Sequence, residues 1–122
     1  MKIKEASELY HMTPDTLRYY ERIGLIRNVH RNKNGIRDYS QENCDAIAFV
    51  KCMRNAGVSI EGLQQYMDFY EKGDTTQQDR LNILLKEREK LATRLERMQN
   101  ALERLDYKID LYRHIIEQKD QS

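Results

Sequence analysis

A heptad repeat of apolar residues in the C-terminal half constrains the fold of this chain more than any other feature. With Leu81 at position a, ten of the eleven a and d positions up to Ile116 are apolar, and only Arg88 departs from the pattern. A continuous helix over 81–116 would be ~54 Å long. Such a seam is typical of a coiled coil, and no other segment of the chain is long enough to cover it.

The heptad therefore predicts a homodimer in which two copies of this helix pack together. The residues expected at the dimer interface are Leu84, Leu91, Leu95, Met98, Leu102, Leu105, Ile109 and Tyr112. The repeat alone leaves open whether the two helices run parallel or antiparallel.

The composition agrees with a small core and one long, exposed helix. Of the 122 residues, 34% are charged and 39% are hydrophobic, and the mean hydropathy is −0.88. No apolar run approaches the ~20 residues of a membrane span, and no signal-peptide pattern begins the sequence. We therefore expect a cytoplasmic protein with no membrane partner, in which the two cysteines are free thiols.

The segment Thr13-Pro14-Asp15 is a strong helix start, with a capping Thr, Pro at the first helical position and an acid near the positive end of the helix dipole. Helical spacing then divides the side chains that follow into two faces. Leu17 and Tyr20 are expected to pack inward, whereas the polar stripe that faces outward consists of Asp15, Arg18, Tyr19 and Arg22. A short amphipathic segment, KIKEASELYHM, precedes the turn, so the two together predict a helix-turn-helix.

A basic hairpin is expected directly after this second helix. Gly24 is a natural helix stop, and Asn34-Gly35 is a strong hairpin-turn signal. The segment from Arg22 to Arg37 contains five cations and no acid, and residues 1–58 carry ten Lys and Arg against seven Asp and Glu. A helix followed at once by a basic hairpin indicates a winged helix, with the helix in the major groove of DNA and the wing along the phosphates.

Two further helices are expected before the coiled coil. One begins after Ser40 and runs to about Asn55, and the other is capped by Ser59 and ends at Gly73. The fold class predicted is mainly α: a winged helix-turn-helix DNA-binding domain over 1–73, with its second helix pair at 41–72, followed by a dimerisation helix and short tail over 74–122.

These motifs resemble the MerR family of bacterial transcription regulators over most of the chain. TLRYYERIGLI is the most specific match, RNKNGIRDYS is similar to the first wing, and MRNAGVSIEGLQQY is similar to the helix pair that forms a second wing. The turn of the family commonly reads Gly-Val-Ser-Pro, whereas this chain has His11 at the first of these positions. If that position requires a positive φ, His11 adopts it at some cost.

The resemblance implies an antiparallel coiled coil and a dimer that binds a pseudo-palindromic promoter. It also implies that the activated dimer bends and untwists this DNA so that RNA polymerase engages both promoter elements. Carried over by motif, the residues expected to contact DNA are Thr16, Arg18 and Tyr19 on the groove-facing helix and Arg37 and Tyr39 on the wing.

Enzymes and metal sensors find little support in the sequence. It contains no Gly-rich phosphate loop, no arrangement of Ser, His and Asp or of Cys and His, and no cysteine in its C-terminal segment. The three histidines are scattered and match no metal-ligand spacing. No catalytic residue, metal or cofactor is therefore expected, and nothing after the coiled coil is long enough for a drug-binding domain.

The two cysteines, Cys44 and Cys52, lie eight residues apart on one expected helix, about 12 Å along its axis. That distance excludes a disulfide within the chain. Cys44 is expected to be a small buried residue. Around Cys52, the neighbouring Lys51 and Arg54 favour the thiolate, whereas the C-terminal end of the helix disfavours it, so its chemistry stays open.

The segment FVKCMRNAGVSIEGLQQY resembles a MerR subgroup with one cysteine at this position, which implies that Cys52 is modified by aldehydes or related electrophiles. Two alternatives stand beside this interpretation. One is a regulator that binds a non-covalent small ligand at the junction of the coil and the DNA-binding domain. The other, from a different class, is a structural or adaptor protein that dimerises through the coil.

Overall fold

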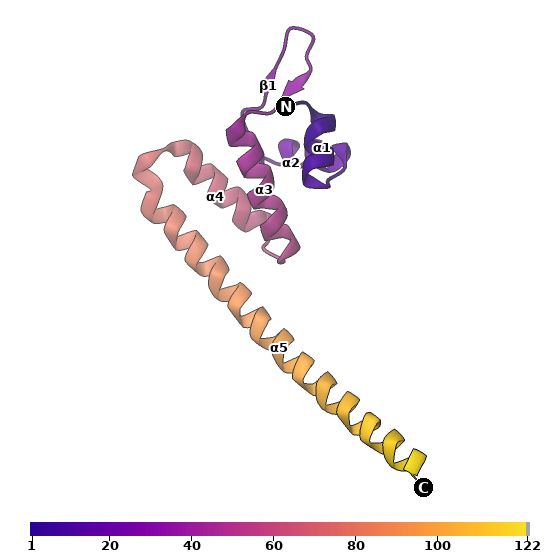
Figure 1. The fold of residues 1–122 in the computed structure, drawn as a ribbon. Helices are drawn as coiled ribbons and strands as arrows, with labels where there is room; N and C mark the ends of the chain where they lie inside the picture. The colour runs from indigo at the N-terminus through magenta and orange to yellow at the C-terminus, as the bar shows by residue number, and fades with distance from the viewer. Residues whose placement is uncertain (122) are drawn as a thin grey trace. The chain divides into compact units, whose positions relative to one another are not determined.

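The structure is a computed structural model that describes residues 1–121, and most of this stretch is helical (Figure 1). In chain order the elements are α1 (Ile3–Tyr10), α2 (Pro14–Arg22), β1 (His30–Arg31), β2 (Arg37–Asp38), α3 (Gln41–Asn55), α4 (Ile60–Lys72), the 3-10 helix η1 (Asp74–Thr76) and α5 (Gln77–Gln121). The chain divides into two compact units, Met1–Glu87 and a second that begins at Arg88. The domain boundary expected between residues 73 and 74 stays a prediction; it falls just after α4, which ends at Lys72.

The helix starts predicted from the sequence are confirmed. The Thr13 side chain accepts a hydrogen bond from the Thr16 N–H at 3.1 Å, and Pro14 occupies the first helical position of α2. Ser40 begins α3 with a capping box that it shares with Asn43, and the Ser59 hydroxyl accepts from the backbone N–H of the third residue of α4. Each of these caps satisfies a backbone donor that the first turn of a helix leaves without an intrahelical partner.

The turn between α1 and α2 places His11 in the left-handed region, with φ 53° and ψ 47°. The Ser7 hydroxyl donates to the Met12 carbonyl at 2.5 Å, and the Met12 N–H donates to the Ser7 carbonyl at 3.1 Å. His11 therefore takes the positive φ considered for the family's glycine position, although it has a side chain. Two hydrogen bonds between Ser7 and Met12 close the turn around it.

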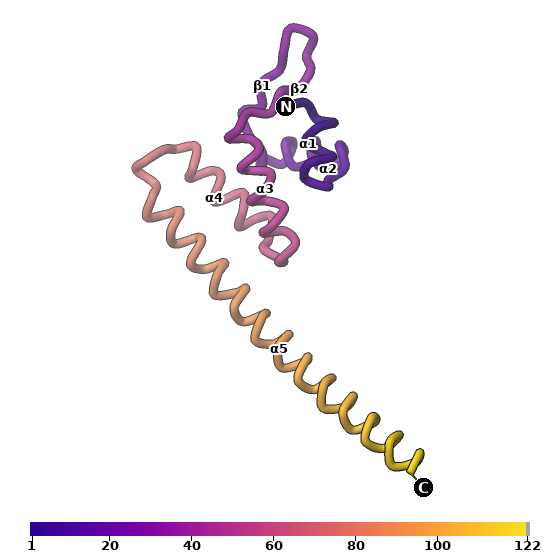
Figure 2. The backbone as a smooth tube through the Cα atoms, viewed as in Figure 1, coloured from indigo at the N-terminus to yellow at the C-terminus, as the bar shows by residue number. Residues whose placement is uncertain are grey.

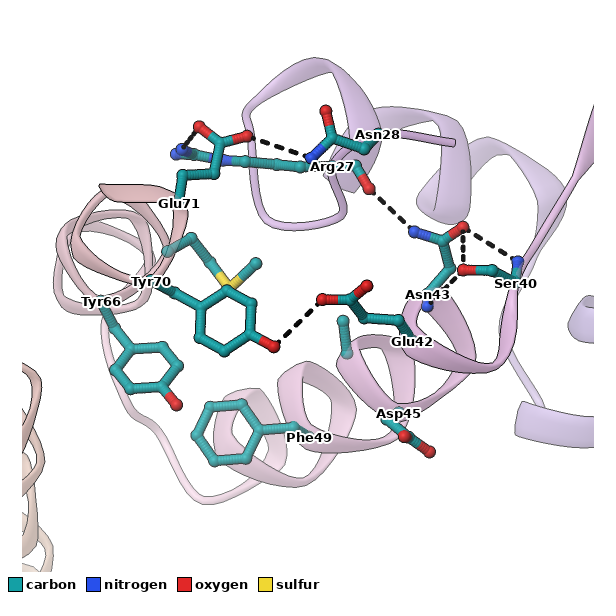
Figure 3. A pocket seen from close by; sticks show the side chains of 12 residues that line it. Arg27, Asn28, Ser40, Glu42, Asn43, Asp45, Phe49, Tyr66, Tyr70 and Glu71 are labelled. Atoms are coloured by element: carbon teal, nitrogen blue, oxygen red, sulfur yellow. Dashed lines mark hydrogen bonds and ion pairs between the residues drawn. The ribbon is translucent and has the colours of Figure 1, made fainter. Parts of the chain in front are cut away.

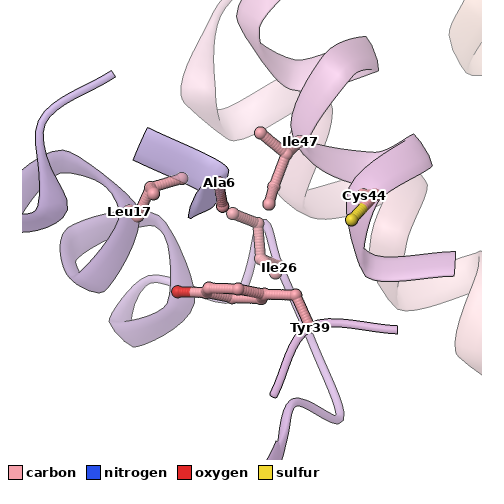
Figure 4. Close-up of a cluster of buried hydrophobic side chains, with 6 residues drawn as sticks. All are labelled: Ala6, Leu17, Ile26, Tyr39, Cys44 and Ile47. Atoms are coloured by element: carbon pink, nitrogen blue, oxygen red, sulfur yellow. The ribbon is translucent and has the colours of Figure 1, made fainter. Parts of the chain in front are cut away.

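Two groups of buried side chains hold the first unit together. The first joins α1, α2, the end of β2 and α3, and consists of Ala6, Leu17, Ile26, Tyr39, Cys44 and Ile47 (Figure 4). The second joins α3 to α4 and consists of Leu25, Val50, Val58 and Leu63. Tyr20 packs against both groups, so one side chain of α2 connects the helix-turn-helix with the α3–α4 pair.

The hairpin has a wider turn than Asn34-Gly35 suggests. β1 pairs antiparallel with β2, with Arg31 opposite Arg37, which leaves 32–36 as the connecting loop. The Asn32 side chain accepts hydrogen bonds from the N–H groups of Asn34 and Ile36 at 2.9 and 3.0 Å, and only Gly35 of this loop takes a positive φ, 76°. A side-chain oxygen thus replaces part of the backbone pairing that a tight two-residue turn would use. The N-terminus lies beside the base of this hairpin (Figure 2).

Helix α5 carries the heptad, and it begins in the first unit and continues in the second. In the single chain its a and d side chains are mostly exposed, for example Leu95 at 62% and Met98 at 69%. An apolar stripe of this length in water requires a covering surface. Among the helices of residues 1–121, none combines the length and the apolar character needed to cross a membrane.

Candidate nucleic-acid interface

The outward face of α2 presents cationic and aromatic side chains together. Arg18 and Tyr19 are exposed, and the Arg22 guanidinium lies 5.3 Å from the centroid of the Tyr19 ring. Tyr20 packs inward, which confirms the predicted division between the two adjacent tyrosines. Thr16 is half-buried, and its hydroxyl shares a hydrogen bond with that of Thr13 at 2.8 Å.

Arg18 is held in place without being buried. Its guanidinium donates to the Asp15 carboxylate, one turn earlier, at 2.9 Å, and its side chain remains 48% exposed. A pair so open to solvent contributes little to stability. Arg18 can therefore exchange this partner for a phosphate or a base edge at small cost.

Glu21 connects α2 to the hairpin and was not singled out from the sequence. Its carboxylate accepts from Arg37 Nε at 2.6 Å, and Arg31 lies 3.6 Å from its other oxygen. Arg37 and Glu21 are each 21% exposed at the side chain, whereas Arg31 is 46% exposed. Arg37 is therefore oriented by an acid beneath it, and Arg31 is the more accessible of the two wing cations.

Tyr39 corrects an expectation from the sequence, because its side chain lies in the core and not on the wing surface (Figure 4). It is 3% exposed, and its hydroxyl has no hydrogen-bond partner among the described residues. Burial, followed by the charge of Glu21, raises the pKa of Tyr39. The physical reason for the difference is the base of the hairpin, where the ring packs against Leu17 and Ile26. Tyr39 thus anchors the wing.

The cations of the acid-free segment have different roles in the structure. Arg27 is 18% exposed and donates to Asp68 at 2.6 Å and to Glu71 at 2.9 Å, both on α4. The Gln64 side chain adds a third link, from α4 to the Ile23 carbonyl at 2.8 Å. Arg27 therefore belongs to the contact between α4 and the end of α2. No sequence signal pointed to these pairs, since about forty residues separate their members.

Cys52 lies exposed in the last turns of α3, whereas Cys44 is buried. The two cations beside Cys52 both donate to backbone carbonyls, Lys51 to Tyr10 in α1 and Arg54 to Val58 at 2.7 Å. The thiol is thus open to reagents and sits between contacts that tie α3 to α1 and to the turn before α4. Within residues 1–121, no three His, Cys, Asp or Glu side chains gather in a group that could hold a metal ion.

Comparison with known proteins agrees with this arrangement. The sequence model described as "MerR HTH family regulatory protein" matches residues 1–70, and the one described as "MerR, DNA binding" matches residues 45–107. The HTH-type transcriptional regulator AdhR of Bacillus subtilis (strain 168) is 50% identical over 91 residues, which make up 75% of this chain and 65% of AdhR. The match therefore spans slightly less than two thirds of that relative.

Solved structures share the fold. A crystal structure described as a MerR family transcriptional regulator from Listeria monocytogenes has a TM-score of 0.96 at 45% identity, covering 99% of this chain and 92% of that one. HiNmlR, a MerR family regulator lacking the sensor domain and bound to promoter DNA, has a TM-score of 0.83 at 24% identity, with 92% and 89% covered. At that identity the likeness to HiNmlR shows the fold alone.

These relatives are regulators, and none of them is an enzyme. The predicted fold class is confirmed in its helix-turn-helix, its two-stranded hairpin and its long C-terminal helix. The chain belongs to the MerR family of helix-turn-helix transcription regulators.

Proposed function

We propose that this chain acts as a homodimer that binds a pseudo-palindromic promoter, with α2 in the major groove and the hairpin along the phosphate backbone. One observation carries the proposal: the exposed stripe of Arg18, Tyr19 and Arg22 on α2 adjoins the wing, where Arg31 and Lys33 are exposed. Guanidinium and phenol groups in such a row suit phosphate oxygens and guanine edges. HiNmlR, which has the same fold, is bound to promoter DNA in its structure.

The roles of the site residues follow from their placement. Arg18 contacts a base or a phosphate, and Tyr19 contacts the backbone. Thr16, at the start of α2, is the third contact of this helix, where the helix dipole also favours a phosphate. Arg37 contacts the phosphate backbone of the DNA, and its hydrogen bond to Glu21 sets its orientation. Tyr39 supports the wing from below and is left out of the contact set, because its side chain is buried.

Dimerisation is assigned to α5. Its exposed a and d side chains, from Leu84 to Tyr112, would be covered by the same helix of a second copy running antiparallel. A two-fold dimer then presents two copies of α2 to two half-sites of the promoter, so that the symmetry of the site mirrors that of the protein. The activated dimer distorts this DNA so that RNA polymerase engages it, in the cytoplasm where a bacterial promoter is located.

Cys52 is proposed as the sensor of aldehydes or other electrophiles. It is the exposed one of the two cysteines, and its segment resembles the MerR subgroup with one cysteine at this position. With an aldehyde, the thiol sulfur bonds to the carbonyl carbon while the carbonyl oxygen takes the proton, which gives a thiohemiacetal. The added group would lie between the Lys51 contact to α1 and the Arg54 contact to the turn before α4, where it would change how these helices pack.

DNA binding is tested with the full chain and the promoter fragment beside its gene. If each dimer makes ~6–10 phosphate contacts, its affinity should fall by ~10³–10⁵ between 50 and 200 mM salt. An adaptor that dimerises through α5 would bind this fragment no better than unrelated DNA. That result would contradict the proposal that the chain is a DNA-binding regulator.

The sensor is tested by transcription in vitro with the wild type, Cys52→Ser and Cys44→Ser, each with and without methylglyoxal. We expect methylglyoxal to change transcription for the wild type and for Cys44→Ser, and to have no effect with Cys52→Ser. An equal response of the wild type and Cys52→Ser would remove the thiol switch while leaving DNA binding intact.

A further inference from the structure

A cavity of about 460 Å³ lies in the first unit between α3 and α4, and no residue of α2 lines it (Figure 3). Its volume falls within the ~300–1,000 Å³ typical of small-molecule sites. Cys52 and the stripe on α2 are not among its lining residues, so neither the proposed sensor nor the proposed DNA contact accounts for it.

One wall of the cavity is aromatic. Phe49 of α3 faces Tyr66 of α4, with ring centroids 5.7 Å apart, and Tyr66 is followed one turn later by Tyr70, at 6.4 Å (Figure 3). Met67 lines the same space. Three neighbouring rings and a thioether offer a polarisable surface whose π faces attract a positive charge.

Carboxylates of α3 line the cavity beside these rings. Glu42 accepts a hydrogen bond from the Tyr70 hydroxyl at 3.0 Å, which raises the pKa of that tyrosine, and Asp45 accepts one from the Gln41 amide at 2.9 Å. Among residues 1–121, neither Glu42 nor Asp45 forms an ion pair with a cation. Glu71, by contrast, is paired with Arg27, which it shares with Asp68. The lining residues therefore carry three carboxylates against the one guanidinium of Arg27, and the Arg80 guanidinium lies outside the lining, 5.4 Å from the centroid of the Tyr70 ring.

We propose that this cavity binds an organic cation in which an ammonium group carries an aromatic or branched alkyl substituent. The ammonium would lie between Glu42 and the rings of Tyr66 and Tyr70, and the substituent would pack on Phe49 and Met67. A neutral or anionic ligand of the same shape would leave the two carboxylates without a counter-charge. This is a property beyond the proposed function, because it requires neither DNA nor the Cys52 thiol.

The test uses the full chain carrying Cys52→Ser, without DNA, titrated with benzyltrimethylammonium and followed by the amide spectrum in solution. We expect saturable binding, with the shifted amides belonging to Phe49, Tyr66 and Tyr70. Benzyl alcohol, a neutral ligand with the same ring, should bind at least tenfold more weakly. Because this experiment contains no DNA and no Cys52 thiol, its failure would leave the DNA-binding proposal standing.

Four further substitutions locate the site. Glu42→Gln keeps a hydrogen-bond acceptor for Tyr70 and removes the charge, so binding should weaken about fivefold. Tyr66→Leu keeps an apolar side chain and removes the ring, and binding should weaken two- to fivefold. Tyr66→Phe keeps the ring and should bind as the wild type does. Glu8→Gln, an equal loss of charge on α1, should also have no effect.

Several results would overturn the proposal. One is the absence of saturable binding. A second copy of the chain that fills the cavity in the dimer would produce this result, and the proposal would then be wrong. Another is equal affinity for benzyl alcohol and benzyltrimethylammonium. A third is an unchanged affinity in Glu42→Gln. If Tyr66→Leu fails to fold, the comparison of Glu42→Gln with Glu8→Gln still decides the question.

Discussion

The carboxylate of Glu21 lies 2.6 Å from Arg37 Nε, and this contact joins α2 to the second strand of the hairpin. Arg31, from the first strand, approaches the same carboxylate at 3.6 Å. The wing and the helix thus form one surface through an acid that lies beneath the cations. A hairpin with only two residues in each strand has little stability of its own, so this contact is important for its orientation.

We expect Glu21→Gln and Arg37→Met each to lower the free energy of unfolding by about 1 kcal/mol, since Gln leaves Arg37 only a neutral acceptor and Met removes the donor of a hydrogen bond that is largely shielded from water. Urea denaturation of the two single variants and the double variant should give a coupling energy of about 1 kcal/mol. The same cycle for Asp15 and Arg18, an exposed pair, should give no measurable coupling. Additive effects at Glu21 and Arg37 would mean that the contact does not hold the wing.

Replacing Arg18 with Ala should weaken promoter binding about tenfold at moderate salt, because a phosphate or base contact is lost. If the contact is to a phosphate, the slope of log K against log salt should fall by about 1, uniformly across DNA sequences. A loss confined to one base position would indicate a base contact. Lys72→Ala, which removes the same charge at the end of α4, is the control. An unchanged affinity of Arg18→Ala for the promoter would contradict the proposal that α2 lies in the major groove.

Replacing Leu95 with Arg should convert the dimer to a monomer. Leu95 is an a position that is 62% exposed in the single chain, and a charge there would be buried in a paired coil. Sedimentation equilibrium should report half the mass of the wild type. Asn100→Asp, which lies at an f position on the outer side of the predicted coil, should stay dimeric. A dimeric Leu95→Arg variant would place the interface elsewhere.

Replacing Arg27 with Met should lower the free energy of unfolding by about 2 kcal/mol, because Asp68 and Glu71 both lose their partner. Arg27→Lys keeps the charge but cannot reach two carboxylates and the Gly24 carbonyl together, so about half of the loss is expected. The urea concentration at the midpoint of unfolding would measure the loss in both Arg27 variants, provided that the dependence of the free energy on urea concentration is unchanged. Equal stability of the wild type and Arg27→Met would show that Gln64 and the buried side chains suffice to hold α4 against the end of α2.

The elements predicted correctly from the sequence depend on neighbours close in the chain. The caps at Thr13, Ser40 and Ser59 bond to backbone groups within three residues, and the outward position of Tyr19 follows from the 3.6-residue period of one helix. The heptad likewise required only its own spacing. The caps, the helix faces and the helical spacing of the heptad each lie within a single element, so the sequence pattern is sufficient for them, whereas the pairing of the heptad in a dimer stays a prediction.

What the tertiary structure alone decided involves partners far apart in the chain. Tyr39 reaches the core because α1, α2 and α3 converge at the base of the hairpin, although its motif placed it on the wing. Arg27 finds Asp68 and Glu71 across about forty residues, and Phe49 meets Tyr66 only where α3 and α4 pack together. A sequence pattern states which side chains share a face of one helix. The contacts between different elements depend on the apolar surface that the whole unit buries together. That buried surface is defined only once the chain has folded.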